Sequence, residues 1–269
     1  MNSSLELIHQ QLQSAVERLV DSEEWRAMLG VAARFHTYST NNQLLIYLQC
    51  PHATRVCGYR AWQRLGRQVR RGERGIQILA PCRRIKAIET EEPGESERVQ
   101  VLTGFRVVHV FDISQTEGEE LPEVAPRRLS GDVPPNLVVA LEKRIAAEGF
   151  MLRREPITRP SCNGYADFVE REVVLKEGLS GAQTIKTLIH ELAHVLLHQE
   201  SAMSVRAVAE VEAESVAFVV CSALNLDTSN YSFAYVARWG GGDTEVIAAT
   251  AQSVITTAND ILSSIEGCD

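Results

Sequence analysis

The sequence predicts an α+β fold: N-terminal helices with a small antiparallel sheet, then a second domain with a short sheet and a histidine-bearing helix. Three observations favour this class. Apolar residues recur at helical spacing over residues 4–20, 22–36 and 41–49. The stretches "GIQILAP" (75–81) and "GFRVVHVFDI" (104–113) have the composition of strands. The chain of 269 residues is long enough for two cores.

Two polar segments separate the predicted elements of the first half. The acidic "ETEEPGESE" between the two predicted strands contains no apolar residue, which predicts a mobile connection. Prolines 122, 126, 134 and 135 then mark a boundary segment. We therefore predict a first domain over residues 1–122 and a second over 123–269.

The second half alternates short strands with helices. A helix is expected over 136–148, followed by strands at 150–154, 164–168 and 171–176. The last two strands read as a hairpin, with an edge strand that could lie along a cleft and pair with a peptide backbone. Helices are expected over 187–198, 209–224, 230–239 and 243–265.

The helix "TLIHELAHVLLH" (187–198) contains three of the seven histidines of the chain. Residues four apart on a helix share a face, so His190 and His194 can bind one metal ion. Glu191, beside them, is placed to act as a general base without being a ligand. This His-Glu-x-x-His pattern is typical of zinc metallopeptidases and predicts one Zn²⁺ in a zincin-like domain. The alternative is a buried helix whose polar residues are satisfied by other partners.

A third protein ligand is expected on the next helix, "AEVEAESVAFVVCSAL" (209–224). We assign it to Glu214, with Glu210 one turn earlier as a residue that orients a histidine. Glu212 is expected on the solvated surface. His198 is interpreted either as a residue supporting the site or as a surface residue.

The residue that stabilises an oxyanion is left open between Tyr165 and Tyr235. In the predicted mechanism, the two histidines and Glu214 leave one metal position to water, whose proton Glu191 accepts and later passes to the leaving amine.

A basic segment in the first half predicts contact with nucleic acid. Ten basic residues and one acidic residue lie between Arg55 and Lys86, a net charge of +9 in a chain of −8. Such a segment suits phosphate, and nearby aromatic side chains suit stacking on single-stranded bases. The candidate contacts are Tyr38, Asn41, Asn42, Arg55, Tyr59, Trp62, Arg67, Arg70, Arg71 and Arg74. The alternative is a solvated basic face with Trp62 in the core.

Composition excludes several other classes. No apolar stretch is long enough to span a bilayer, so no membrane partner is expected. The N-terminus lacks the pattern of a secretion signal. The six cysteines form no Cys-x-x-Cys pair and are interpreted as free thiols, which favours a cytoplasmic location.

The first half resembles the single-stranded-DNA-binding domain of ArdC-type antirestriction proteins. The resemblance covers "FHTYSTNNQLLIYLQCPHATRVCGYRAWQRLGRQVRRGERGIQILAP" (35–81) and "GFRVVHVFDISQTEGEELP" (104–122). The second half is similar to ImmA/IrrE-like zinc peptidases over "TLIHELAHVLLH" and "EAESVAF" (212–218), where Glu214 falls at the third-ligand position. The resemblance implies a protein of a plasmid, phage or other mobile element that shields incoming single-stranded DNA from restriction.

Three hypotheses follow. The first is a zinc endopeptidase of unknown protein substrate that its N-terminal domain docks on single-stranded DNA. The second is a DNA-protecting protein with a non-proteolytic zinc site. The third is a peptidase that cleaves repressors, as ImmA/IrrE-like regulators do. An intact Glu191 favours an active site, because a purely structural zinc has no need of it.

Overall fold

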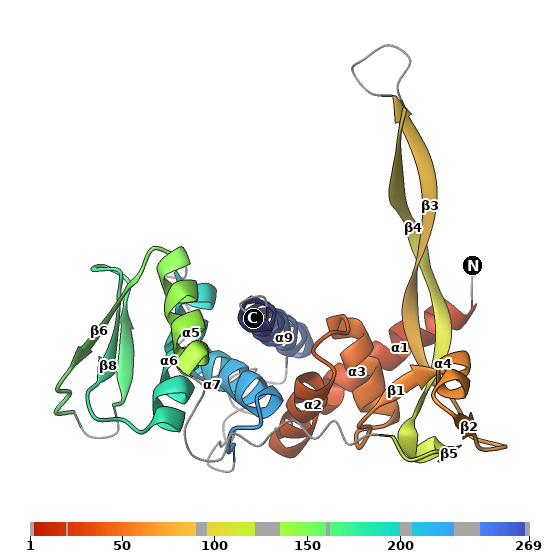
Figure 1. Ribbon diagram of the computed structural model, residues 1–269, viewed down its shortest axis with the longest axis horizontal. Coiled ribbons are helices and arrows are strands. Elements are labelled where there is room, and N and C mark those ends of the chain that lie inside the picture. The colour runs from red at the N-terminus through yellow and green to blue at the C-terminus, as the bar shows by residue number, and fades with distance from the viewer. Residues whose placement is uncertain are drawn as a thin grey trace. The chain divides into compact units, whose positions relative to one another are not determined.

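A computed structural model of the protein describes residues 3–19, 21–89, 96–121, 135–159, 162–199, 206–228 and 243–266 (Figure 1). These ranges have the α+β fold that the sequence predicts. Contacts between Cα atoms divide the chain into two compact units: unit 1 contains residues 1–15 and 44–121, and unit 2 contains residues 16–43 and 122–269. The predicted boundary between residues 122 and 123 stays a prediction, since residues 16–43 also group with the C-terminal part.

Unit 1 is built around a long antiparallel hairpin (Figure 1). β3 (Ile76–Glu89) pairs along its whole length with residues 96–110 of β4 (Ser96–Asp112), with a register shift between Cys82 and Arg83. At the base, β1 (Val56–Gly58) adds a third strand beside the end of β4. The two strands are longer than the sequence predicts, because residues 83–85 and 100–103 are exposed and lack the alternation of a half-buried strand.

Smaller elements complete the base of the hairpin. α4 (Tyr59–Arg64) follows β1, and β2 (Arg67–Val69) pairs antiparallel with β5 (Thr116–Gly118) after the short 3-10 helix η1 (Ile113–Gln115). α1 (Ser3–Arg18) and α3 (Thr40–Gln49) each have residues in both units. Gln49, at the end of α3, joins β3 because its amide donates to the Gln77 carbonyl at 3.0 Å and accepts the Gln77 N–H at 2.9 Å.

Unit 2 packs helices around a three-stranded sheet of order β6-β8-β7. β6 (Met151–Glu155) is parallel to the central β8 (Glu172–Lys176), and β7 (Gly164–Asp167) is antiparallel to it at the edge. The helices are α2 (Ser22–Arg34), α5 (Pro135–Ala147), α6 (Gly181–His198), α7 (Arg206–Ala223) and α9 (Thr244–Glu266). α6 contacts β7, β8, α5, α7 and α9, so it lies at the centre of this core.

The packing of α2 on α7 explains why residues 16–43 belong to unit 2. Trp25 and Ser215 are both 0% exposed, and the Trp25 indole donates to the Ser215 hydroxyl at 3.0 Å. Sequence periodicity shows that α2 has an apolar face but not which helix covers it.

The predicted helix 230–239 and the Pro-rich boundary lie outside the described residues. Within the described part of the chain, no helix is long and apolar enough to cross a membrane.

Candidate metal centre and nucleic-acid interface

α6 places the two histidines of the motif side by side. The helix starts at the N-cap Ser180 and buries Ile185, Leu188, Ile189, Leu192 and Val195, which fixes its rotation about its axis. His190 and His194, one turn apart, then point their Nε2 atoms at the same space, 3.2 Å from each other. The predicted spacing of the two imidazoles is therefore present in the structure.

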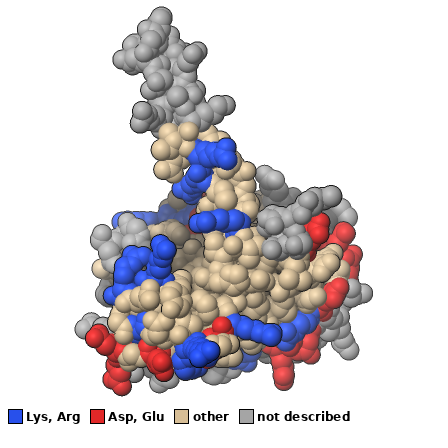
Figure 2. Space-filling model, turned by 90° about the vertical axis from the view of Figure 1, so that its right-hand side faces the viewer, with Lys and Arg blue, Asp and Glu red and all other residues tan. Residues whose placement is uncertain are grey.

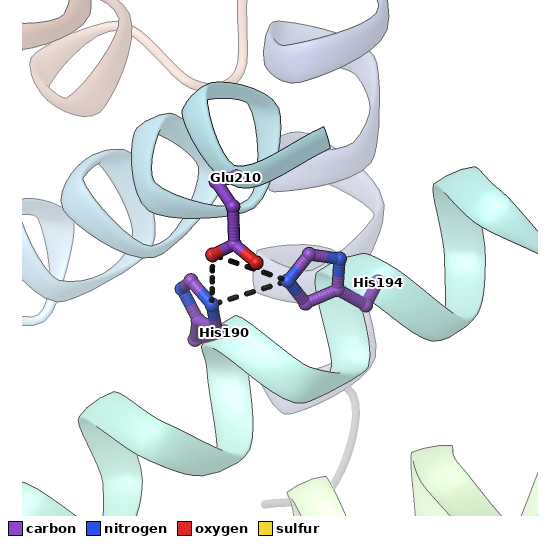
Figure 3. Close-up of side chains that lie close together, drawn as sticks. All are labelled: His190, His194 and Glu210. Carbon is purple, nitrogen blue, oxygen red and sulfur yellow. Dashed lines mark hydrogen bonds and ion pairs between the residues drawn. The ribbon is translucent and has the colours of Figure 1, made fainter. Parts of the chain in front are cut away.

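α7 packs on α6 and adds Glu210 to the pair (Figure 3). The Glu210 Oε2 atom lies 3.6 Å from His190 Nε2 and 3.9 Å from His194 Nε2. Three ligands at ~2.0–2.1 Å from a tetrahedral ion lie roughly 3.3 Å apart. Two imidazoles and one carboxylate with these separations fit a divalent cation, which would be held by His190, His194 and Glu210.

Glu210 and Glu214 have exchanged places relative to the prediction from the sequence. Glu210, expected to orient a histidine, joins the two Nε2 atoms, whereas Glu214, the expected ligand, approaches the opposite nitrogen of His190. The distance from Glu214 Oε2 to His190 Nδ1 is 3.4 Å. A carboxylate on the second ring nitrogen fixes the tautomer and orientation of a ligating histidine. The structure therefore favours Glu210 as the third ligand and Glu214 as the residue that orients His190.

His194 has a corresponding support on its other side. Its Nδ1 atom lies 3.0 Å from Nδ1 of His198, and Nε2 of His198 lies 3.0 Å from the Glu212 carboxylate. The side chains of His198 and Glu212 are 7% and 15% exposed. The expectation of a solvated Glu212 is therefore wrong: α7 packs closely enough on α6 for this carboxylate to reach His198. His198 is therefore not a surface residue: it is buried beside His194 and lines the same cavity.

We expect His198→Ala to weaken metal binding by roughly 10–100-fold, because it removes the partner that orients His194. Glu212→Gln should have a smaller effect in the same direction, since an amide can still bond His198. A competition titration against a chromogenic zinc chelator measures both. His109→Ala, which removes an exposed histidine of unit 1, is the matched control. Unchanged affinity in His198→Ala would show that His198 only fills space.

The buried charges of the site differ in their proton affinity. Burial raises the pKa of Glu191 to about 7, against the opposing effects of His190 and of the Ala166 N–H that it accepts. Burial opposes the charged form of His190, but Glu210 and Glu214 outweigh this and raise its pKa to about 10. Burial and the neighbouring His190 lower the pKa of His194 to about 4. A metal ion must therefore displace the proton of His190.

The histidines and glutamates line a cavity of about 860 Å³ beside the edge strand β7. β7 lies close to α6 because residue 164 is a glycine: an added Cβ would lie 2.8 Å from Cγ2 of Thr187. Tyr165 lines the cavity, and its hydroxyl donates to Glu155 at 3.1 Å. The second oxyanion candidate, Tyr235, lies outside the described residues.

The predicted nucleic-acid contacts are distributed over both units. Tyr38, Asn41 and Asn42 belong to unit 2 and the others to unit 1. In unit 1, Tyr59 is 43% exposed and packs edge-to-face on Phe111, while Arg71 and Arg74 are exposed. These three keep the accessibility that a contact with nucleic acid needs.

Three other candidates have partners within unit 1. Trp62 is 0% exposed and donates to the Phe111 carbonyl at 2.9 Å, so the expectation that it stacks on bases is wrong and the alternative of a core residue holds. Arg67 donates to the Thr116 hydroxyl and carbonyl at 2.8 and 3.2 Å, which joins β2 to β5. Arg70 binds Glu73 and the Ser114 carbonyl at 2.7 and 2.6 Å. Arg55 is half-buried.

Comparison with known proteins identifies the first part of the chain. Residues 4–111 match a family model described as the N-terminal domain of anti-restriction factor ArdC. We refer to these residues as the ArdC N-terminal domain, after the family model that they match. This confirms the resemblance for the first half. The match includes α2, so the ArdC N-terminal domain contributes a helix to the unit that holds the metal-site residues.

Solved structures and a curated relative extend the likeness along the chain. One similar structure is the metal-free crystal structure of the antirestriction ArdC protein from plasmid R388, whose sequence is 24% identical to this chain. The match covers 95% of this chain and 98% of that chain, with a TM-score of 0.59. Its Mn(II)-bound structure is 22% identical, covers 94% and 97%, and has the same TM-score. These likenesses support the α+β fold.

An uncharacterized protein of Bacillus anthracis is 25% identical over 282 residues, which cover 91% of this chain and 48% of that protein. The chain therefore spans about half the length of this relative.

The burial of Trp62 in the ArdC N-terminal domain leads to a stability prediction. We expect Trp62→Ala to lower the free energy of unfolding of this domain by about 3–5 kcal/mol, because it leaves a large cavity and an unpaired Phe111 carbonyl. Denaturant unfolding followed by circular dichroism measures the loss. Tyr59→Ala, at an exposed aromatic residue three positions earlier, should cost much less. A native-like unfolding curve for Trp62→Ala would contradict the core assignment.

Proposed function

We propose that unit 2 is a zinc-dependent endopeptidase. The observation that carries this proposal is the set of His190, His194 and Glu210 around one point, with Glu191 buried next to them in a cavity. A bound divalent cation supplies Lewis-acid catalysis, which polarises a carbonyl and lowers the pKa of water. The donor set of two imidazoles and one carboxylate suits zinc.

The residues around the metal position have separable roles. Glu191 is not among the three converging ligands, and its raised pKa matches a general base that works near neutral pH. The edge strand β7 borders the cavity and offers backbone groups on its unpaired side to an extended peptide. Glu214 and His198 hold the two imidazoles from behind.

We also propose that the ArdC N-terminal domain binds single-stranded DNA in the cytoplasm and that this binding serves antirestriction. The match to the family model and the net charge of +9 between residues 55 and 86 support this role. DNA binding would bring the peptidase to a protein substrate at the DNA. The two alternatives, a non-proteolytic metal site and a repressor-cleaving peptidase, differ from this proposal in the fate of the partner protein.

The test of the peptidase is cleavage of a denatured-proteome peptide library by the zinc-loaded protein, read by mass spectrometry. We expect new peptide termini that disappear with a chelator and return with zinc. The Glu191→Gln protein, prepared in parallel, is the control for contaminating peptidases. Termini that are the same with both proteins would contradict proteolysis and favour a non-proteolytic metal site.

The test of DNA binding compares labelled single-stranded and duplex oligonucleotides by fluorescence anisotropy at matched salt. We expect tighter binding of the single strand, because a duplex hides its base faces from aromatic side chains. Equal affinity for both forms at every salt concentration would contradict single-strand recognition and leave only a non-specific basic surface.

A further inference from the structure

The distal part of the β3–β4 hairpin is a two-stranded ribbon. Among the residues that the structure describes, β3 and β4 have only each other as strand neighbours beyond the part of β4 that pairs with β1. A two-stranded hairpin without further packing is at best marginally stable in water. An exposed ribbon of this length is therefore a candidate for a surface that another molecule covers.

The register of the ribbon gathers apolar side chains on one face. Residues directly opposite in an antiparallel pair point to the same side, and alternate pairs share it. Three successive pairs on this side are Pro81 with Phe105, Arg83 with Leu102 and Ile85 with Gln100. Phe105, Leu102 and Ile85 are 52%, 53% and 68% exposed. We call this side, from Gln77 to Ile85 on β3, the Phe105 face.

The charge of the ribbon is entirely positive over its described side chains. Arg83, Arg84 and Arg106 are exposed, and residues 76–85 and 100–111 contain no Asp or Glu. Figure 2 shows Lys and Arg along the ribbon, separated by other residues. Arg83 lies on the same side of the ribbon as Phe105, whereas Arg84 and Arg106 pair on the opposite side. An exposed arginine near an exposed aromatic ring suits a polyanion that carries flat bases.

The Phe105 face leads into a cavity at the base of the hairpin. Gln77 and His109 pair on the same side as Phe105 and line this cavity, which has a volume of about 980 Å³. Arg70 and Arg74 line it as well, together with Glu73, which pairs with Arg70 at 2.7 Å. From Gln77 to Ile85 the face is about 26 Å long by strand rise. The apolar face and the basic cavity are therefore one continuous surface of unit 1.

We propose that the Phe105 face and this cavity bind a single strand of nucleic acid. The proposal rests on the proposed DNA-binding function and specifies its surface. A base stacks on Phe105, Leu102 and Ile85 contact its neighbours, and Arg83 and Arg74 bind phosphates at the two ends. A protein partner or a second copy of the chain would cover the apolar side chains equally well. The arginines beside them, Arg83 on the face and Arg74 at the cavity, favour a polyanion.

The test uses the full chain and a fluorescein-labelled 12-nucleotide oligothymidylate, with anisotropy recorded over a range of salt concentrations. Phe105→Ala should weaken binding by roughly 5–150-fold, the effect of one lost base stack, without changing the salt dependence. Phe105→Tyr, which keeps the ring, should bind like the wild type. Met151→Ala removes an exposed apolar side chain from β6 of unit 2 and is the matched control.

Charge is tested separately. Arg74→Gln/Arg83→Gln should reduce the slope of log affinity against log salt by roughly 1.4, because two phosphate contacts on a single strand are lost. Arg153→Gln/Arg154→Gln removes the same charge from β6 of unit 2 and should leave the slope unchanged. Thermal melts of all variants by circular dichroism check that unit 1 stays folded.

The outcomes separate this inference from the function on which it rests. If the wild type does not bind the oligonucleotide, both are wrong. If the wild type binds and the folded Phe105→Ala and double-arginine variants bind as tightly, DNA binding stands and the ribbon surface is overturned. A shift from dimer to monomer on sedimentation of Phe105→Ala, with unchanged DNA binding, would overturn it too and assign the face to a second copy.

Discussion

Glu191→Gln is expected to keep the metal and to lower the rate of peptide cleavage by roughly 10²–10⁴-fold. The substitution preserves size and the ability to accept the Ala166 N–H, but a neutral amide cannot accept a proton. Glu191 is 5% exposed, so bulk buffer has little access to replace it as a base. Initial rates on a peptide found by the library screen, at saturating zinc, give the ratio.

Two comparisons show whether the effect belongs to the carboxylate. Glu191→Asp should recover part of the rate, because it restores a base at a longer distance from its target. Zinc content measured by plasma mass spectrometry should be equal in the wild type and both variants. Cleavage by Glu191→Gln at more than a tenth of the wild-type rate would mean that another group accepts the proton.

The same carboxyl group sets a pH dependence. Burial raises its pKa to about 7 in the metal-free protein, and it is a base only when it has lost its proton. Cleavage should therefore fall as the pH decreases through a pKa at or below about 7, since a bound cation favours the anion. The kcat/KM profile of the wild type should show this acidic limb. A profile flat between pH 5 and 8 would contradict a general base with this pKa.

Glu210→Ala is expected to reduce zinc to well below one per chain after dialysis, whereas Glu214→Ala should keep most of it. The first substitution removes an atom 3.6 Å from His190 Nε2 and 3.9 Å from His194 Nε2, and the second removes a carboxylate behind His190. Loss of such a supporting carboxylate lowers the affinity for the metal by roughly 10–100-fold but leaves the ligands in place. Plasma mass spectrometry and chelator competition measure both values.

A matched control for this pair is Glu177→Ala, which removes a glutamate from outside the cavity lining and should retain full zinc. The reverse result, with zinc lost from Glu214→Ala and retained by Glu210→Ala, would restore the assignment that the sequence predicts.

The sequence predicts that His190 and His194 come together but does not predict the place of Glu210, because the two histidines lie on one helix and Glu210 lies on another. Helical spacing alone brings two histidines four residues apart to one face. The third ligand comes from another helix, and spacing shows only that Glu210 and Glu214 share a face. Which of them faces the Nε2 atoms depends on where α7 crosses α6. The same crossing brings Glu212 to His198, which no local pattern could show.

For the fold as well, local patterns in the sequence predict the elements but not the contacts between distant parts of the chain. Helices and strands with one buried face follow from periodicity: α2 and β8 lie where the sequence predicts, and α6 includes the predicted helix 187–198 but begins at Gly181. The pairing of Trp25 with Ser215 joins residues from opposite ends of the chain and has no local signal. The predicted strands are shorter than the ribbon because Arg83, Ile85 and Leu102 are exposed, so hydrophobic alternation, which reports burial, does not mark them as strand.

The most direct test of the metal centre is an anomalous difference map from crystals of the zinc-loaded protein, recorded on both sides of the zinc absorption edge. We expect one strong peak per chain about 2.0–2.1 Å from Nε2 of His190, Nε2 of His194 and a carboxylate oxygen of Glu210, with Glu191 not bound. A peak bound instead by Glu214, or no peak between the two histidines at full zinc loading, would contradict it.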